Sequence, residues 1–184
     1  DNLTPCPEVG ELTGIITTEE NETVSGVYLQ VNGTNLGYER ITQADGSFSI
    51  GGLEIGSDYT IAPAKNEDLL NGISTFDLVL ISKHILGTSL LNSPYKLIAA
   101  DVNNSGSIST LDLIILRQNL LLQRSDFAGN TSWRFLPTSY SFPVPQNPWS
   151  ASFPEVININ DLQGTVQVDF VAIKVGDVNN SAIN

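Results

Sequence analysis

Side chains that carry oxygen atoms recur at set positions in the segment from Asp101 to Asp112. Counted from Asp101, they occupy positions 1, 3, 5, 9 and 12, with Gly106 at position 6 and an apolar residue at position 8. A hard divalent cation prefers oxygen ligands, and Ca²⁺ collects about six or seven of them around a sharp turn at such a glycine. The spacing therefore predicts calcium binding, with Ser107 contributing its backbone carbonyl and the full ligand set being Asp101, Asn103, Ser105, Ser107, Ser109 and Asp112.

A weaker copy of this segment precedes it in the chain. The letters ISTFDL at 73–78 align with ISTLDL at 108–113, which indicates an internal duplication. In the earlier copy Asn71 replaces the turn glycine, but Asn tolerates the left-handed backbone of a tight turn, so the loop can still close. The alternative is a degenerate loop held by packing alone. The ligands predicted for this copy, two of them through main-chain carbonyls, are Asn66, Asp68, Leu70, Gly72, Ser74 and Asp77.

The opening letters of the stronger loop, DVNNS, occur a second time at 177–181. Half a loop cannot fill a coordination sphere by itself. We hypothesise that Asp177 and Asn179 complete a cation site with oxygen atoms from the weaker loop of the same chain or from a neighbouring subunit. A polar turn that leads into a linker is the alternative.

Two apolar stretches, LVLISKHIL and LIILRQNLL, each follow one of the two loops and are too long for strands in this setting, so they predict helices. Each loop ends in Asp rather than Glu, and no helix precedes it. With these features residues 66–122 resemble a type I dockerin. The resemblance implies calcium binding and, as a candidate partner, a cohesin.

One detail of these repeats argues against the cohesin interpretation. Dockerins of this kind present polar pairs such as Ser-Thr at loop positions 10 and 11, where this chain has Thr75-Phe76 and Thr110-Leu111. We expect the apolar members to serve an internal contact rather than an exchangeable polar interface.

Alternating apolar and polar residues on both sides of the repeats predict strands. Residues 11–64, which include VSGVYLQV and ADGSFSIGGLEIGSDYTI, resemble the carboxypeptidase regulatory-like family, a transthyretin-like β-sandwich. The predicted fold class is mainly β with a small α part: a β-sandwich plus a two-helix dockerin-like unit packed with further strands. The predicted domains are 1–64, the sandwich, 65–124, the dockerin-like pair, and 125–184, a C-terminal β segment packed on that pair.

Charge and composition exclude several partners. The net charge of −12, from 20 acidic and 8 basic residues, repels nucleic acid and anionic lipid and attracts divalent cations. No apolar run approaches the roughly 18 residues of a membrane-spanning helix, so we expect no membrane insertion. The absence of Met predicts that an N-terminal segment such as an export signal has been removed, or that the chain is a piece of a longer one.

Cys6 cannot form an internal disulfide, and we expect it to be a small apolar side chain, with a bond between chains as the alternative.

Together these features predict a non-catalytic, calcium-stabilised structural module of an extracellular bacterial surface protein, filament or adhesin. Its expected partners are copies of itself or other surface domains. An enzyme is not expected, because His84 lies beside Lys83 on a predicted helix and completes no catalytic triad. A cohesin-binding dockerin is the first alternative. A carbohydrate-binding module is the second, with a stacking platform of Trp133, Tyr140, Phe142 and Trp149.

Overall fold

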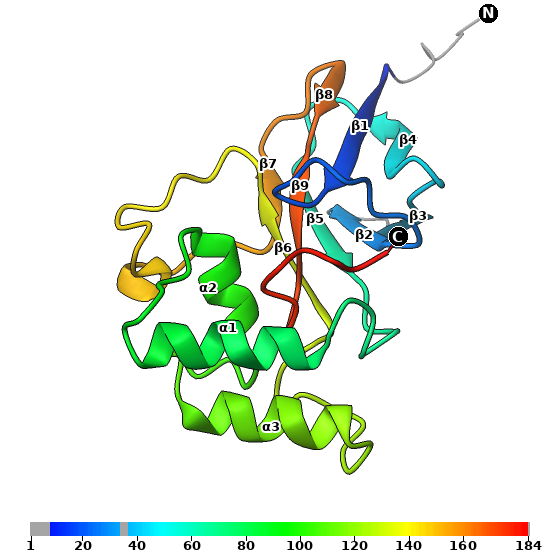
Figure 1. Cartoon of the computed structure of the whole chain (residues 1–184). Helices are drawn as coiled ribbons and strands as arrows, with labels where there is room; N and C mark the ends of the chain where they lie inside the picture. Colours follow the sequence, from blue (N-terminus) through cyan, green and yellow to red (C-terminus); the bar gives the residue numbers. More distant parts are fainter. Residues whose placement is uncertain (1–7, 34–36, 184) are drawn as a thin grey trace, which may run out of the picture.

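The strands of the computed structural model, which describes residues 8–33 and 37–183, form two sheets (Figure 1). The first has the order β4-β1-β9-β6, with β8 also paired to β1, and the second has the order β3-β2-β5-β7. The predicted fold class, mainly β with a small helical part, is confirmed. Cys6 lies outside the described residues, so the prediction for its side chain stays a prediction. The strand bounds are β1 Val9–Thr17, β2 Tyr28–Gly33, β3 Gly37–Ile41, β4 Ser47–Glu54, β5 Tyr59–Ala64, β6 Trp133–Pro137, β7 Ile157–Ile159, β8 Thr165–Gln167 and β9 Phe170–Lys174.

Alternate residues of the N-terminal strands fill the core between the sheets. In β2, Leu29 and Val31 are buried while their neighbours face solvent, as the period of two in a strand requires. Leu12 and Ile16 of β1 and Ile61 of β5 are fully buried in the same core. The core is therefore built across both sheets, as in a sandwich.

The C-terminal strands complete the sheets that the N-terminal strands begin. β9 runs parallel to β1 and antiparallel to β6, and β7 pairs with β5 of the other sheet. The segment 125–184 was expected to pack on the dockerin-like part. It does so through one face of β6 and β9, but it is also part of the sandwich.

Both faces of β6 and β9 are buried, because each strand lies between two cores. Phe135 and Phe170 point into the sandwich core, whereas Leu136 and Ile173 belong to a second core beneath the helices. Strands that are covered on both faces lack the alternation of apolar and polar residues, and these two are apolar apart from Arg134 and Lys174.

Three helices cover the second core (Figure 1): α1 Thr75–Ile85, α2 Pro94–Ala100 and α3 Thr110–Leu120. Only α1 and α3 were predicted. The short helix α2 begins at Pro94 after the N-cap Ser93, and its last four residues are buried. Among the described helices, none combines the length and apolar character needed to cross a membrane.

Candidate cation-binding site

The loop from Asp101 to Asp112 connects α2 to α3 and is organised around its two terminal carboxylates. Asp101 accepts hydrogen bonds from the backbone N–H groups of Ser105 and Gly106, both at 2.8 Å. Asp112 accepts one from Ser109 N–H at 2.8 Å as part of the capping box of α3. Both carboxylates are fully buried, with 0% exposure.

The other predicted ligands lie on the same loop. Asn103 Oδ1 accepts a hydrogen bond from Ser105 N–H at 3.1 Å, and Ser105 Oγ donates one to the Ser107 carbonyl at 3.2 Å. Gly106 has a φ of 78°, so the turn uses the left-handed backbone that glycine adopts without strain. The predicted oxygen atoms are therefore arranged around one tight turn.

The charge of this loop is not balanced by basic side chains. Burial raises the pKa of Asp101 and the neighbouring Asp112 raises it further, whereas the N–H groups of Ser105 and Gly106 lower it. The ion pairs among the described residues involve neither carboxylate. Within the described part of the chain, no three His, Cys, Asp or Glu side chains gather at one point. A cation here would have two carboxylates and otherwise neutral oxygens, a set that suits Ca²⁺.

Two residues from the β segment brace the loop, and sequence reasoning missed both. Asn130 Nδ2 donates to the carbonyls of Asp101 and Val102, at 3.2 and 3.3 Å. Arg134, buried on β6, donates to Asn104 Oδ1 at 2.8 Å. A charged residue inside the apolar strand WRFLP was the sequence signal for Arg134.

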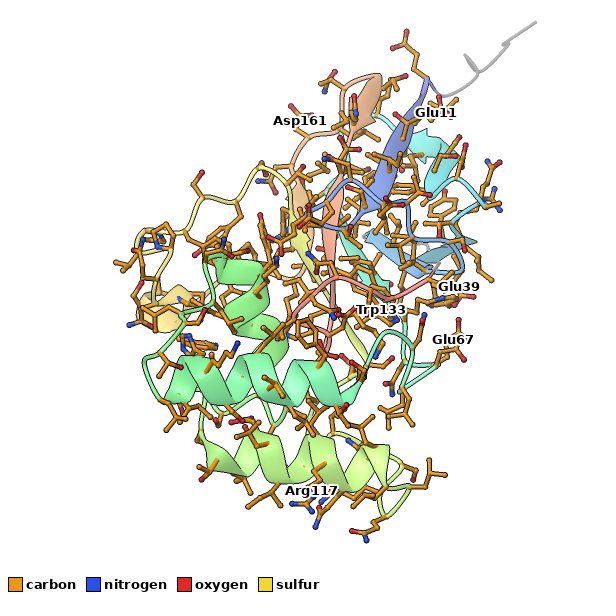
Figure 2. All side chains as sticks on the ribbon, in the orientation of Figure 1. Glu11, Glu39, Glu67, Arg117, Trp133 and Asp161 are labelled. Carbon is orange, nitrogen blue, oxygen red and sulfur yellow. The ribbon has the colours of Figure 1, made fainter. Side chains whose placement is uncertain are left out.

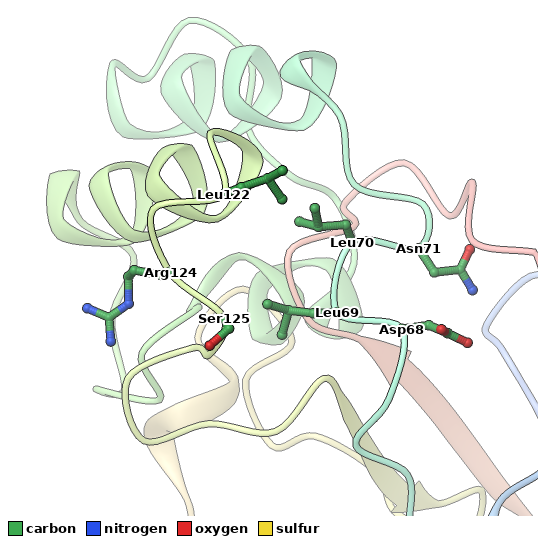
Figure 3. A pocket seen from close by; sticks show the side chains of 7 residues that line it. All are labelled: Asp68, Leu69, Leu70, Asn71, Leu122, Arg124 and Ser125. Atoms are coloured by element: carbon green, nitrogen blue, oxygen red, sulfur yellow. The ribbon is translucent and has the colours of Figure 1, made fainter.

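The predicted ligands in the first half of the weaker loop lie in separate environments. Asn66 Oδ1 accepts a hydrogen bond from Ser132 N–H at 2.9 Å, so it serves the β segment. Figure 3 shows Leu70 facing Leu122 across a pocket, with Asp68 turned away on the other side. The side chains of Asn66, Asp68 and Leu70 therefore point in different directions.

The oxygen-rich chain end contacts the second half of this weaker loop. Val178 N–H donates to Asp77 Oδ1 at 3.0 Å, and Ser181 Oγ donates to the Gly72 carbonyl at 2.8 Å. Burial raises the pKa of Asp177, the N–H groups of Ser181 and Ala182 lower it, and nearby Asp77 raises it. The structure thus brings Asp177 together with Gly72 and Asp77.

The apolar residues at loop position 11 face solvent, contrary to expectation. Phe76 is 53% exposed and Leu111 is 51% exposed. Each lies in the first turn of its helix, on the side away from the shared core, and Val79 and Ile114 extend the same face one turn further. The prediction that these residues make an internal contact was wrong, because the helices pack through other residues such as Ile81 and Ile115.

The remaining candidate residues have structural environments. His84 Nδ1 accepts a hydrogen bond from Leu91 N–H at 3.1 Å, and burial lowers the pKa of this imidazole. Trp133, labelled in Figure 2, is 2% exposed in the sandwich core. Phe142 packs edge-on against Tyr95 and Tyr140. These aromatic rings do not form one exposed platform.

Comparison with known proteins finds a family similarity in the helical unit. Residues 71–121 match the type I dockerin domain family, whose members in general bind calcium and cohesins. The matched segment begins at Asn71, so residues 66–70 of the originally predicted loop lie outside it. No significant match is found among curated proteins.

Short likenesses to solved structures involve two Bacillus proteins. The Bacillus anthracis TIE protein is 26% identical over 31% of this chain and 11% of its own, with a TM-score of 0.29. BcpA, the major pilin subunit of Bacillus cereus, is 24% identical over 32% of this chain and 17% of its own, with a TM-score of 0.27. The chain therefore spans less than one fifth of the length of either protein.

Proposed function

We propose that this chain is a non-catalytic structural module of an extracellular bacterial surface protein, filament or adhesin, and that Ca²⁺ in the loop 101–112 stabilises it. The observation that carries the proposal is the pair of fully buried carboxylates, Asp101 and Asp112, which have no basic partner among the described ion pairs. Burying two like charges is costly unless an opposite charge compensates them. A divalent cation supplies that charge, and the surrounding neutral oxygens complete its shell.

The packing of the helices supports a structural role. The dockerin-like unit shares its core with β6 and β9, and Asn130 and Arg134 tie the loop to the β segment. A cation bound in this loop therefore stiffens the junction between helices and sandwich, which benefits a module that holds its shape outside the cell. The carboxypeptidase regulatory-like character of residues 11–64 and association with neighbouring surface domains are parts of the same proposal.

Calorimetric titration of the full chain with Ca²⁺ tests the role of this loop. Asp101→Asn should abolish binding at one site, because it removes a buried charged ligand while keeping the side-chain shape. Asp161→Asn is the matched control, since Asp161 is an exposed residue of a turn. Wild-type protein that binds no Ca²⁺ after metal removal would refute the proposed function.

A second candidate function is docking to a cohesin through the exposed apolar face. This face consists of Phe76, Val79, Leu111 and Ile114, which occupy equivalent positions of the two repeats. Exposed apolar groups at the centre of an interface contribute strongly to binding. These exposed apolar residues favour binding to a partner protein. They differ from the polar pairs, such as Ser-Thr, that type I dockerins present at loop positions 10 and 11.

Binding to a purified type I cohesin tests this second function. The double variant Phe76→Glu with Leu111→Glu should weaken binding by more than about tenfold, because each truncated anchor of this kind typically costs over 1 kcal/mol. Ile41→Glu, on β3 and 63% exposed, is the control. Wild-type protein with no measurable affinity for the cohesin would exclude this function without affecting the calcium proposal.

A further inference from the structure

The chain end is folded into the first half of a cation loop. Asp177 accepts hydrogen bonds from the N–H groups four and five residues later, those of Ser181 at 3.2 Å and Ala182 at 2.8 Å. Asp101 accepts the two equivalent bonds in the loop 101–112, both at 2.8 Å. The repeated letters DVNNS therefore fold in the same way at both places.

The second half comes from the segment that leads into α1. Ser74 N–H donates to Asp77 Oδ2 at 2.8 Å, and the Gly72 carbonyl accepts a hydrogen bond from Ser181 Oγ at 2.8 Å. The equivalent bonds in the loop 101–112 measure 2.8 and 3.2 Å. Residues 72–77 thus repeat the arrangement of loop positions 7 to 12.

The two halves meet without space between them. Asn71 and Ile183 exchange two hydrogen bonds, with the Asn71 side chain donating at 2.7 Å and accepting at 3.0 Å. A Cβ atom on Gly72 would lie 2.5 Å from Asp177 Oδ2 and from the Ala182 nitrogen. The junction between position 6 and position 7 is therefore a contact between distant segments instead of a peptide bond, and glycine is required there.

The combined loop has the donors of a hard-cation site. Asp77 is 0% exposed and Asp177 is 2% exposed. The Asn179 Oδ1 atom, at loop position 3, is buried and has no hydrogen-bond partner. Lys174, which is close enough to influence Asp177, instead donates its hydrogen bonds to the carbonyls of Leu69 and Val175. A buried amide oxygen without a donor, beside two buried carboxylates, is a position that a cation would satisfy.

We propose that residues 177–182 and 72–77 form one split calcium loop, which binds a second Ca²⁺ ion. Its ligands are Asp177, Asn179, Ser181, the Gly72 carbonyl, Ser74 and Asp77. The inference rests on the proposed function, because it extends calcium binding from the continuous loop to this one. The bound ion would connect the chain end, which follows β9, to the start of α1.

Native mass spectrometry and calorimetry on the full chain measure the number of bound Ca²⁺ ions. We expect two ions in the wild type and one in Asp177→Asn and in Asp101→Asn. Asp68→Asn is the discriminating control, because a continuous first loop would use Asp68 whereas the split loop does not. It should retain two ions.

Asn179→Ala is a variant that preserves the hydrogen bonds of the fold, because the Asn179 amide oxygen has no hydrogen-bond partner. It should lower the affinity of one site by at least tenfold and leave the other unchanged. Hydrogen exchange adds a second measurement: Ca²⁺ should slow exchange at residues 178–182 in the wild type but not in Asp177→Asn.

The outcomes separate this inference from the proposed function. One bound ion in the wild type that is lost in Asp101→Asn and kept in Asp177→Asn refutes the split loop and leaves the proposed function intact. Loss of one ion in Asp68→Asn together with two ions in Asp177→Asn restores the continuous register and also refutes the split loop. Wild-type protein without bound Ca²⁺ refutes both.

Discussion

Replacing Asp112 with Ala should reduce stability through two separable effects. Asp112 Oδ2 accepts a hydrogen bond from Ser109 N–H at the start of α3, and losing a cap of this kind costs about 1 kcal/mol. A cation that binds only the folded loop contributes RT ln(1 + [L]/Kd), about 2.7 kcal/mol at a hundredfold excess over Kd. The variant should therefore lose about 4 kcal/mol in calcium but only about 1 kcal/mol in chelator.

Thermal unfolding in the two conditions measures this difference. In a chain of this size each kcal/mol shifts Tm by about 2–4 °C, so we expect a drop of roughly 8–16 °C in calcium and 2–4 °C in chelator. Asp58→Ala is the control, because Asp58 lies between β4 and β5 of the sandwich, where its Oδ1 accepts a hydrogen bond from Asp161 N–H at 2.8 Å. It should lower Tm equally in the two conditions. An equal drop for Asp112→Ala in calcium and in chelator, after confirmed metal removal, would show that the loop binds no stabilising cation.

Two further substitutions test the packing around the helical core. Burial lowers the pKa of Lys174 to about 8, so between about pH 8 and 10.5 the unfolded state binds more protons and stability rises with pH. In the wild type the free energy of unfolding should rise by about 2 kcal/mol between about pH 7.5 and 9.5, and Lys174→Met should lack this rise. Urea titrations without metal measure both proteins, and parallel pH profiles of their unfolding free energies would contradict the prediction. Gly176→Ala should cost about 2 kcal/mol or more, because its φ is 88° and a Cβ would lie 2.8 Å from Ile73 and Leu116. Gly87 also has a positive φ, but a Cβ there would meet open space, so Gly87→Ala should lose less stability in the same titrations. An equal loss in the two variants would show that the contacts with Ile73 and Leu116 do not cause the destabilisation of Gly176→Ala.

Local patterns predicted the parts of the structure that depend on neighbouring residues. Helices α1 and α3 follow from their apolar stretches, each placed directly after a polar loop, and the loop 101–112 follows from its spacing. Helix α2 was missed because PYKLIAA is too short to show a helical period.

Pairings between distant segments could not be predicted in the same way. Nothing in the letters of β9 specifies that it lies beside β1, because that choice depends on packing of the whole sandwich. The repeated DVNNS led to the hypothesis that Asp177 and Asn179 share a cation site with the weaker loop or with a neighbouring subunit, but it could not decide between these partners or against a polar turn. The register with Asn66 and Asp68 followed from assuming a continuous loop, and the contact between Val178 and Asp77 is nonlocal.

The position of β6 and β9 makes the helical unit and the sandwich mechanically dependent on each other. Each strand contributes alternate side chains to both cores, so separating the helices would expose Leu136 and Ile173, while removing β9 would open the first sheet beside β1. The chain end that follows β9 contacts Asp77 at the start of α1. A force on the sandwich that reaches β9 is therefore transmitted to the helices through a shared core and through the contacts of the chain end. A dockerin that only presents a docking face does not need such a connection, whereas a module that must keep its shape under load gains from it.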